Sequence, residues 1–117
     1  MSTRAEREAR GRRGEWLAAW YLRLTGWRVV ARRIKTPRGE IDLIARRGRT
    51  IAFVEVKWRA RGEDLGVAID HYRLRRVVDA AAGVAHRYVP EGFDWRIDVL
   101  LLAPGRLPRH IVNATLS

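Results

Sequence analysis

The feature that most constrains the fold is a run of three strand-like segments joined by two short turns. The segments span residues 27–35, 40–46 and 50–58. They are separated at residues 36–39 and 47–49 by stretches containing the turn formers proline and glycine. The central part of the chain therefore predicts three consecutive β-strands.

A helix-like segment precedes these strands. It begins near Thr3, which has the spacing of a capping box with a glutamate three residues later, and it runs to Leu24. Gly14 is a weak point within it. The alternative is a mobile basic arm over residues 1–13 and a helix that starts at Glu15.

A second helix is expected between Asp70, a suitable N-cap, and Pro90. Its apolar side chains recur at helical spacing. They are Leu74, Val77, Val78, Ala81, Ala85 and Tyr88. An apolar strand over residues 95–102 and a short segment at 110–114 complete the chain. The order α-β-β-β-α-β predicts an α/β fold in which helices flank a mixed β-sheet, as a single domain over residues 1–117.

Charge indicates the kind of partner. The chain has 24 Lys and Arg against 13 Asp and Glu, a net charge of +11. Such a field favours a nucleic acid, because neutralising phosphates releases condensed counterions. The longest apolar run, residues 16–22, is far shorter than the ~20 residues that cross a bilayer, and the charged start lacks a signal sequence. We expect a cytoplasmic protein with no membrane partner.

Acidic residues occur in two of the predicted strands. If Gly48-Arg49 is the loop of a hairpin, counting back along the strands puts Asp42 across from Glu55 and Glu40 across from Lys57. Opposed residues point to the same face with their Cβ atoms ~5 Å apart. The register therefore predicts four ionisable groups at one end of the ribbon.

This cluster needs a cation. Two carboxylates ~5 Å apart repel by about 3 kcal/mol at an effective dielectric near 20, and one lysine cannot neutralise three acids. A hard divalent ion such as Mg²⁺ suits oxygen ligands. Glu40 is interpreted as a partner of Lys57 rather than as a further ligand. The alternative is an exposed sheet face with ordinary cross-strand ion pairs.

Asp42 followed by Glu55-Val56-Lys57 resembles the PD-(D/E)XK nuclease signature. The sequence from about residue 11 to 114 resembles the YraN (UPF0102) family, which is similar to archaeal Holliday-junction resolvases in that superfamily. The matching motifs are Gly14-Glu15, Gly39-Glu40-Ile41-Asp42-Leu43-Ile44, Phe53-Val54-Glu55-Val56-Lys57, Leu65-Gly66, Arg96-Ile97-Asp98-Val99 and Asn113-Ala114.

The resemblance implies a restriction-endonuclease-like fold and a metal-dependent nuclease that hydrolyses DNA, in preference to RNA, at branched or junction structures. It implies that Asp42 and Glu55 hold Mg²⁺, or Mn²⁺ in its place, with the backbone carbonyl of Val56 as a third ligand. Lys57 would orient or deprotonate the attacking water, and Glu15 would be an outer acid. Junction resolution would require two active sites and hence a homodimer.

Several arginines are candidates for phosphate contacts. Arg12 and Arg13 form a basic lead-in to the first helix, and Arg73 and Arg76 lie one turn apart on the second. A solvated helix face predicts the same spacing. Arg73 stands where the family usually has lysine, and Arg33 replaces a frequent asparagine.

The tryptophans are expected in the core rather than at a base-stacking surface. Trp16 and Trp20 lie at i and i+4, and Trp95 opens a buried-looking strand. Trp58 alternates away from Glu55. The three histidines have no ligand-like spacing, and we assign them no role.

Two other functions remain open. One is a nucleic-acid-binding module on the same scaffold without turnover, and the other is an RNA-associated protein whose acids are purely structural. The intact set of Asp42, Glu55 and Lys57 favours the nuclease, because a degenerate scaffold is free to lose one of them.

Overall fold

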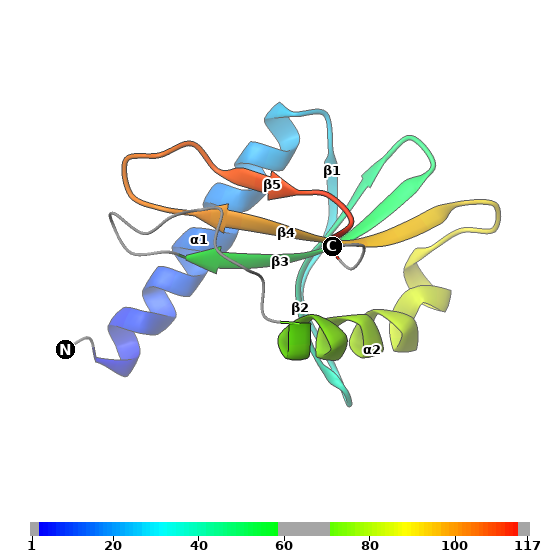
Figure 1. Ribbon diagram of the computed structural model, residues 1–117, viewed down its shortest axis with the longest axis horizontal. Helices are drawn as coiled ribbons and strands as arrows, with labels where there is room; N and C mark the ends of the chain where they lie inside the picture. Colours follow the sequence, from blue (N-terminus) through cyan, green and yellow to red (C-terminus); the bar gives the residue numbers. More distant parts are fainter. Residues whose placement is uncertain (1–2, 59–70, 115–117) are drawn as a thin grey trace.

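A computed structural model describes residues 3–58 and 71–114; of residues 4, 6–12 and 71–73 it describes the backbone alone. Within these described residues, two helices and five strands follow one another (Figure 1). They are α1 (Arg4–Leu24), β1 (Arg28–Thr36), β2 (Gly39–Arg47), β3 (Thr50–Trp58), α2 (His71–Tyr88), β4 (Asp94–Leu102) and β5 (Arg109–Ile111).

All five strands form one sheet in the order β1-β2-β3-β4-β5. The pairs β1–β2, β2–β3 and β4–β5 are antiparallel, whereas β3 and β4 are parallel. A parallel pair needs a long crossover connection, and the segment that contains α2 provides it. The predicted α/β fold with a mixed sheet is confirmed. Strand β5 adds to the prediction, which left the end of the chain unassigned.

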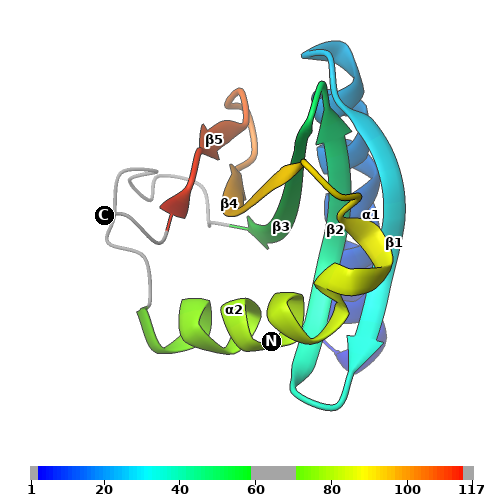
Figure 2. The ribbon, with the colours of Figure 1, turned by 90° about the vertical axis from the view of Figure 1, so that its right-hand side faces the viewer.

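The two helices cover opposite faces of the sheet (Figure 2). On the α2 face the core includes Phe53, Leu74 and Ile97, and on the α1 face it includes Leu22 and Val54. Alternate residues of β3 thus enter different cores, as the strand period requires. The predicted N-cap of the second helix, residue 70, lies outside the described residues.

Helix α1 runs unbroken through Gly14, so the residues on both sides of this glycine belong to one helix. A Cβ atom at this position would collide with the indole ring of Trp58. The glycine therefore lets α1 approach β3 closely. In the described part of the chain, no helix is long and apolar enough to cross a membrane.

The side chains of β2 stop alternating regularly between the two faces of the sheet at Asp42. Ile41 and Ile44 both enter the α2-side core, while Leu43 enters the α1-side core. Regular alternation would put residues 41 and 43 on one face. Arg33, which the register places opposite Asp42, has a left-handed φ of 50°. This conformation breaks the alternation that the sequence predicts for residues 40–44.

The prediction that the tryptophans are buried is wrong for three of them. Trp16 is 53% exposed, Trp20 46% and Trp95 39%, and the first two contact each other edge to face. The buried side chains of α1 include Ala18, Ala19 and Leu22, so this helix contacts the core through positions other than its tryptophans. Trp27 is buried, as expected.

A buried ionic cluster holds β5 against β4. Asp98, which is fully buried, accepts hydrogen bonds from Arg96 at 3.0 and 3.2 Å and from the backbone amide of Asn113 at 2.9 Å. His110 Nε2 lies 2.7 Å from the same carboxylate. Trp27 packs edge to face against His110. This histidine therefore has a structural role that its spacing did not reveal.

Candidate active site

The candidate site lies where β2 and β3 separate. Their ladder runs from Arg47 opposite Thr50 to Leu43 opposite Val54, so the predicted hairpin register is confirmed over this stretch. At the next position the Asp42 carboxylate accepts a hydrogen bond of 2.8 Å from the Val56 amide. The side chain of Asp42 thus bonds to β3 where the backbone pairing between β2 and β3 has ended. This bond places the Asp42 carboxylate between the two strands.

The expected pairing of Glu40 with Lys57 is not formed. The ladder between β2 and β3 has ended by this point, and Glu40 pairs with Lys35 across the β1–β2 hairpin. The turn of the ribbon at Asp42 carries the tip of the hairpin away from β3. Gly39 at this tip has a φ of 147°, which a residue with a side chain rarely adopts.

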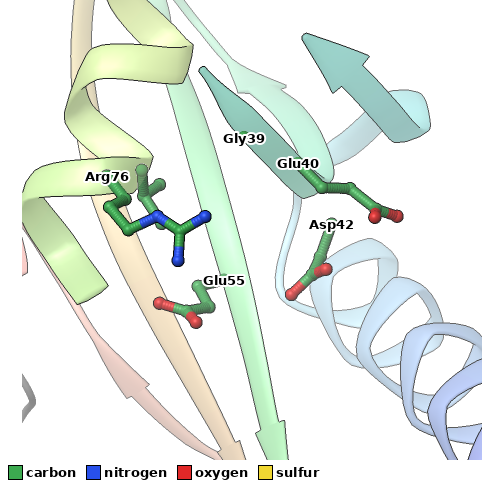
Figure 3. Close-up of a pocket in the computed structure, with 6 residues that line it drawn as sticks. Gly39, Glu40, Asp42, Glu55 and Arg76 are labelled. Carbon is green, nitrogen blue, oxygen red and sulfur yellow. The ribbon is translucent and has the colours of Figure 1, made fainter. Parts of the chain in front are cut away.

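Asp42 and Glu55 line one open cavity of about 260 Å³ (Figure 3). Gly39 and Glu40 contribute the β2 side of this cavity, and Arg76 reaches into it from α2 toward Glu55. Glu55 is almost fully buried, and Arg76 is exposed. The lining of the cavity thus includes three acids on strands and one arginine on a helix.

Burial raises the pKa of Asp42 to about 6. The hydrogen bond from the Val56 amide opposes this rise, whereas the nearby carboxylates of Glu55, Glu15 and Glu40 add to it. Asp42 is therefore an acid whose negative charge the chain itself compensates only in part. A cation bound beside it would favour the ionised form.

Glu15 lies at the edge of this acidic group. Its side chain is 16% exposed and accepts a hydrogen bond from Arg33 Nε. The bond raises the pKa of Arg33, to which the charges of Glu15, Glu40 and Asp42 also contribute. The structure therefore brings the predicted outer acid close to Asp42, through an arginine that the sequence marked only as a departure from the family pattern.

Lys57 lies on the same face of β3 as Glu55. Phe53, two residues before Glu55, enters the α2-side core, and the strand is regular from Thr50 to Trp58. The side chain of Lys57 is half-buried. Trp58 packs with the α1-side core, as its alternation predicts.

The candidate phosphate contacts fall into two groups. Arg13 and Arg76 are exposed, and Arg76 also lines the cavity. The side chains of Arg12 and Arg73 lie outside the described residues. Arg76 is thus the candidate arginine that the structure brings to the acids.

Comparison with known sequences identifies the family. Residues 14–102 match the family described as "Uncharacterised protein family UPF0102". A UPF0102 protein of Sphingopyxis alaskensis is 63% identical over 95% of this chain and 96% of its own length. A UPF0102 protein of Erythrobacter litoralis is 60% identical over 92% of each chain.

A solved structure has a similar fold. It is Hjc of Archaeoglobus fulgidus, a Holliday junction resolvase from an archaeal hyperthermophile. The TM-score is 0.59 and the sequence identity 22%, over 86% of this chain and 73% of Hjc. This likeness shows that the two proteins share a fold, and the sequence matches show that the chain belongs to the UPF0102 family.

Proposed function

We propose that this protein is a metal-dependent endonuclease that hydrolyses phosphodiester bonds of DNA, with branched or junction DNA as its substrate. The observation that carries the proposal is the pairing of Asp42 with Glu55 in one cavity, with the pKa of Asp42 raised to about 6 in a chain of net charge +11. Acids gathered without full compensation are typical of a functional site.

The donor atoms suit Mg²⁺, with Mn²⁺ as a substitute. Asp42 and Glu55 would be the carboxylate ligands, and the carbonyl of Val56 would be the third. The amide and carbonyl of a strand residue point to the same neighbour, so the bond from the Val56 amide to Asp42 indicates that its carbonyl faces this gap. Oxygen ligands of this kind are those that hard cations prefer.

The bound ion would polarise the scissile phosphate and lower the pKa of a water molecule. Lys57 would orient or deprotonate that water and stabilise the negative charge that develops on the phosphate. Arg76 would hold the phosphate from the α2 side, and Glu15 would fix the outer edge of the site. Attack of water on phosphorus would break the bond to the 3′-oxygen, which would leave as a 3′-hydroxyl, and the other strand end would carry a 5′-phosphate.

The nucleic-acid partner is inferred from charge and from the fold. Hjc, which shares the fold, is a Holliday junction resolvase, and resolving a junction requires two cuts and hence a homodimer. Exposed Arg13 and Arg76 are the described candidates for phosphate contacts. Substituting one of them with alanine should reduce the slope of log K against log salt concentration for DNA binding by about one.

A nicking assay tests the proposal. Supercoiled plasmid and a synthetic four-way junction would be incubated with Mg²⁺, Mn²⁺ or EDTA. We expect cleavage with either metal and none with EDTA. Lys57→Ala should lower the rate by ~10²–10⁴-fold, as expected for loss of a general acid–base group, and Asp42→Asn should abolish cleavage. Asp79→Asn, which changes an exposed acid on α2, is the matched control.

A second candidate is a DNA-binding module without turnover. It is favoured by the observation that, among the side chains that the structure describes, no three histidine or acidic residues come close enough to hold a metal ion. The same assay separates the two. Tight junction binding that Asp42→Asn leaves unchanged, with no cleavage under either metal, would establish the module and overturn the nuclease.

A further inference from the structure

The end of the sheet opposite the candidate site is strongly basic. Figure 2 shows the β2–β3 turn at the top of the sheet and the tip of the β1–β2 hairpin at the bottom. Four exposed arginines lie at or beside the β2–β3 turn: Arg28, Arg46, Arg47 and Arg49. Strand β2 rises ~3.4 Å per residue from Asp42 to its end, so the turn lies roughly 17 Å from the candidate site.

The chain compensates these positive charges only weakly. Arg28 pairs with Arg46 across β1 and β2, and like charges directly opposite each other destabilise a sheet. Among the residues that the structure describes, no carboxylate forms an ion pair with any of the four arginines. An acid, Asp94, lies beside the turn, where its amide donates a hydrogen bond of 2.9 Å to the Arg49 carbonyl. The turn therefore keeps a surplus of positive charge.

Two of these arginines are held by contacts other than ion pairs. The Arg46 guanidinium lies 4.6 Å from the centre of the Phe93 ring, and its Nε donates a hydrogen bond of 3.2 Å to the Gly48 carbonyl. The Arg47 guanidinium lies 4.8 Å from the centre of the Trp27 ring. A guanidinium has five N–H donors, so stacking fixes its position and leaves most of these donors for a ligand.

The two stacked arginines lie on opposite faces of the sheet. Ile44 enters the α2-side core and Ala45 the α1-side core, so strand alternation puts Arg46 on the α2 side and Arg47 on the α1 side. The rings on which they stack agree, because one packs against the α2-side core and the other belongs to the α1-side core. Duplex DNA has a phosphate backbone on each side of every groove. Cations on both sides of one turn therefore suit a duplex.

We propose that the β2–β3 turn is a second DNA contact, in which Arg46 and Arg47 bind phosphates on the two strands of a duplex arm and Arg49 adds a contact at the tip. The inference rests on the proposed function for its nucleic-acid partner, but it requires no cleavage. With phosphates ~3.4 Å apart along a strand, this contact lies roughly five base pairs from the scissile phosphate. It raises affinity for uncut duplex beside the site without reading its sequence.

The test is the binding of a blunt linear DNA duplex in EDTA, followed by fluorescence anisotropy over a range of salt concentrations. Each lost phosphate contact lowers the slope of log K against log salt concentration by about one. We therefore expect the slope to fall by about two for Arg46→Gln/Arg47→Gln and by about one for Arg49→Gln. Arg46→Lys/Arg47→Lys retains both charges and should keep the wild-type slope.

The matched control is Arg106→Gln/Arg109→Gln. Both residues are exposed and lie beyond or beside the far end of β4, the strand that starts next to the turn. This variant loses the same charge as the first double variant and should keep the wild-type slope.

Two results overturn the inference: turn variants that keep the wild-type slope, and a control pair whose slope falls as much as that of the turn pair. A fall seen only with single-stranded DNA or duplex RNA also overturns it. A wild type that binds duplex DNA through the turn but cuts none contradicts the proposed function and leaves the inference standing. Nicking by the wild type, with turn variants of unchanged slope, has the reverse meaning.

Discussion

Asp42 and Asp98 are two acids in the same sheet with opposite electrostatic surroundings. Burial alone would raise the pKa of Asp98, but hydrogen bonds from His110, the Asn113 amide and Arg96 hold it below the usual value. Asp42 has one backbone amide as a donor and three carboxylates nearby, and its pKa is raised to about 6. The chain surrounds one acid with donors and cations and gives the other a single backbone donor among like charges.

The difference suggests a criterion for buried acids: whether the chain itself supplies all the donors and cations that the carboxylate needs. A buried acid with all its partners in the chain fixes the fold, and here it fastens β5 to β4. A buried acid among like charges costs stability in the free protein, and acids in such surroundings are common at functional sites. The predictions below test this contrast in order of decreasing effect.

The largest effect is expected at the neutralised acid. Asp98→Asn should destabilise the protein by about 3–5 kcal/mol at neutral pH, because it leaves Arg96 without its buried counterion. Urea unfolding measures this loss. Because the folded pKa of Asp98 is lowered, the stability it contributes is present above the unfolded value near 3.8 and is lost as the pH falls through the folded value.

The control is Asp94→Asn on the same strand, where the side chain is exposed. Its free energy of unfolding should change by no more than about 0.5 kcal/mol. An Asp98→Asn variant as stable as this control would show that the cluster does not hold β5.

The opposite sign is expected at Asp42. In the absence of metal, Asp42→Asn should stabilise the protein at pH 8, since asparagine can still accept the bond from the Val56 amide and carries no charge. The difference between about 6 and the usual 3.8 corresponds to about 3 kcal/mol at most. The measurement is the free energy of unfolding of both proteins in EDTA.

The pH dependence gives this prediction a second check. A folded pKa above the unfolded one means that Asp42 favours the folded state below pH ~3.8, and that this contribution is lost as the pH rises through about 6. The stability advantage of Asp42→Asn should therefore be full at pH 8 and should disappear toward pH 4. An advantage independent of pH would show that charge is not its cause.

The smallest changes in stability are expected for two helix glycines, Gly14 and Gly83, when each is replaced by alanine. The two substitutions serve as controls for each other. Gly14→Ala should destabilise by about 1–3 kcal/mol, because the new Cβ meets the Trp58 ring on which α1 packs. Gly83→Ala in α2 meets nothing within 4 Å and should stabilise by about 0.5–1 kcal/mol. Thermal unfolding of both variants checks this, and equal shifts would contradict the close approach of α1 to β3.

The sequence predicted the elements well because their signals are local. Turn formers bounded the strands, and the apolar spacing of α2 gave its buried side, where Leu74 and Val77 lie in the core. The hairpin loop fixed the register that brings Asp42 to β3. These features depend on neighbours in the chain, which is why they were accessible.

The predictions from sequence failed where the structure depends on contacts between segments far apart in the chain. No residue near Asp98 in the sequence indicates that His110 on β5, and Asn113 just after this strand, will contact it. Trp16 is exposed because α1 contacts the core through other positions, such as Ala18 and Leu22. The break in strand alternation at Asp42 lies opposite the left-handed φ of Arg33. In the sequence, Arg33 drew notice only because it stands where the family often has asparagine. This difference was the signal for its contact with Glu15.

The most direct test of the central claim is the effect of Mn²⁺ on the stability of wild type and Asp42→Asn at pH 7.5. Mn²⁺ at about 100 times its dissociation constant should add about 2.7 kcal/mol to the free energy of unfolding of the wild type. It should leave Asp42→Asn unchanged, although this variant should be the more stable of the two in EDTA. Equal stabilisation of both proteins, or of neither, would contradict the account of Asp42 as an acid that awaits a cation.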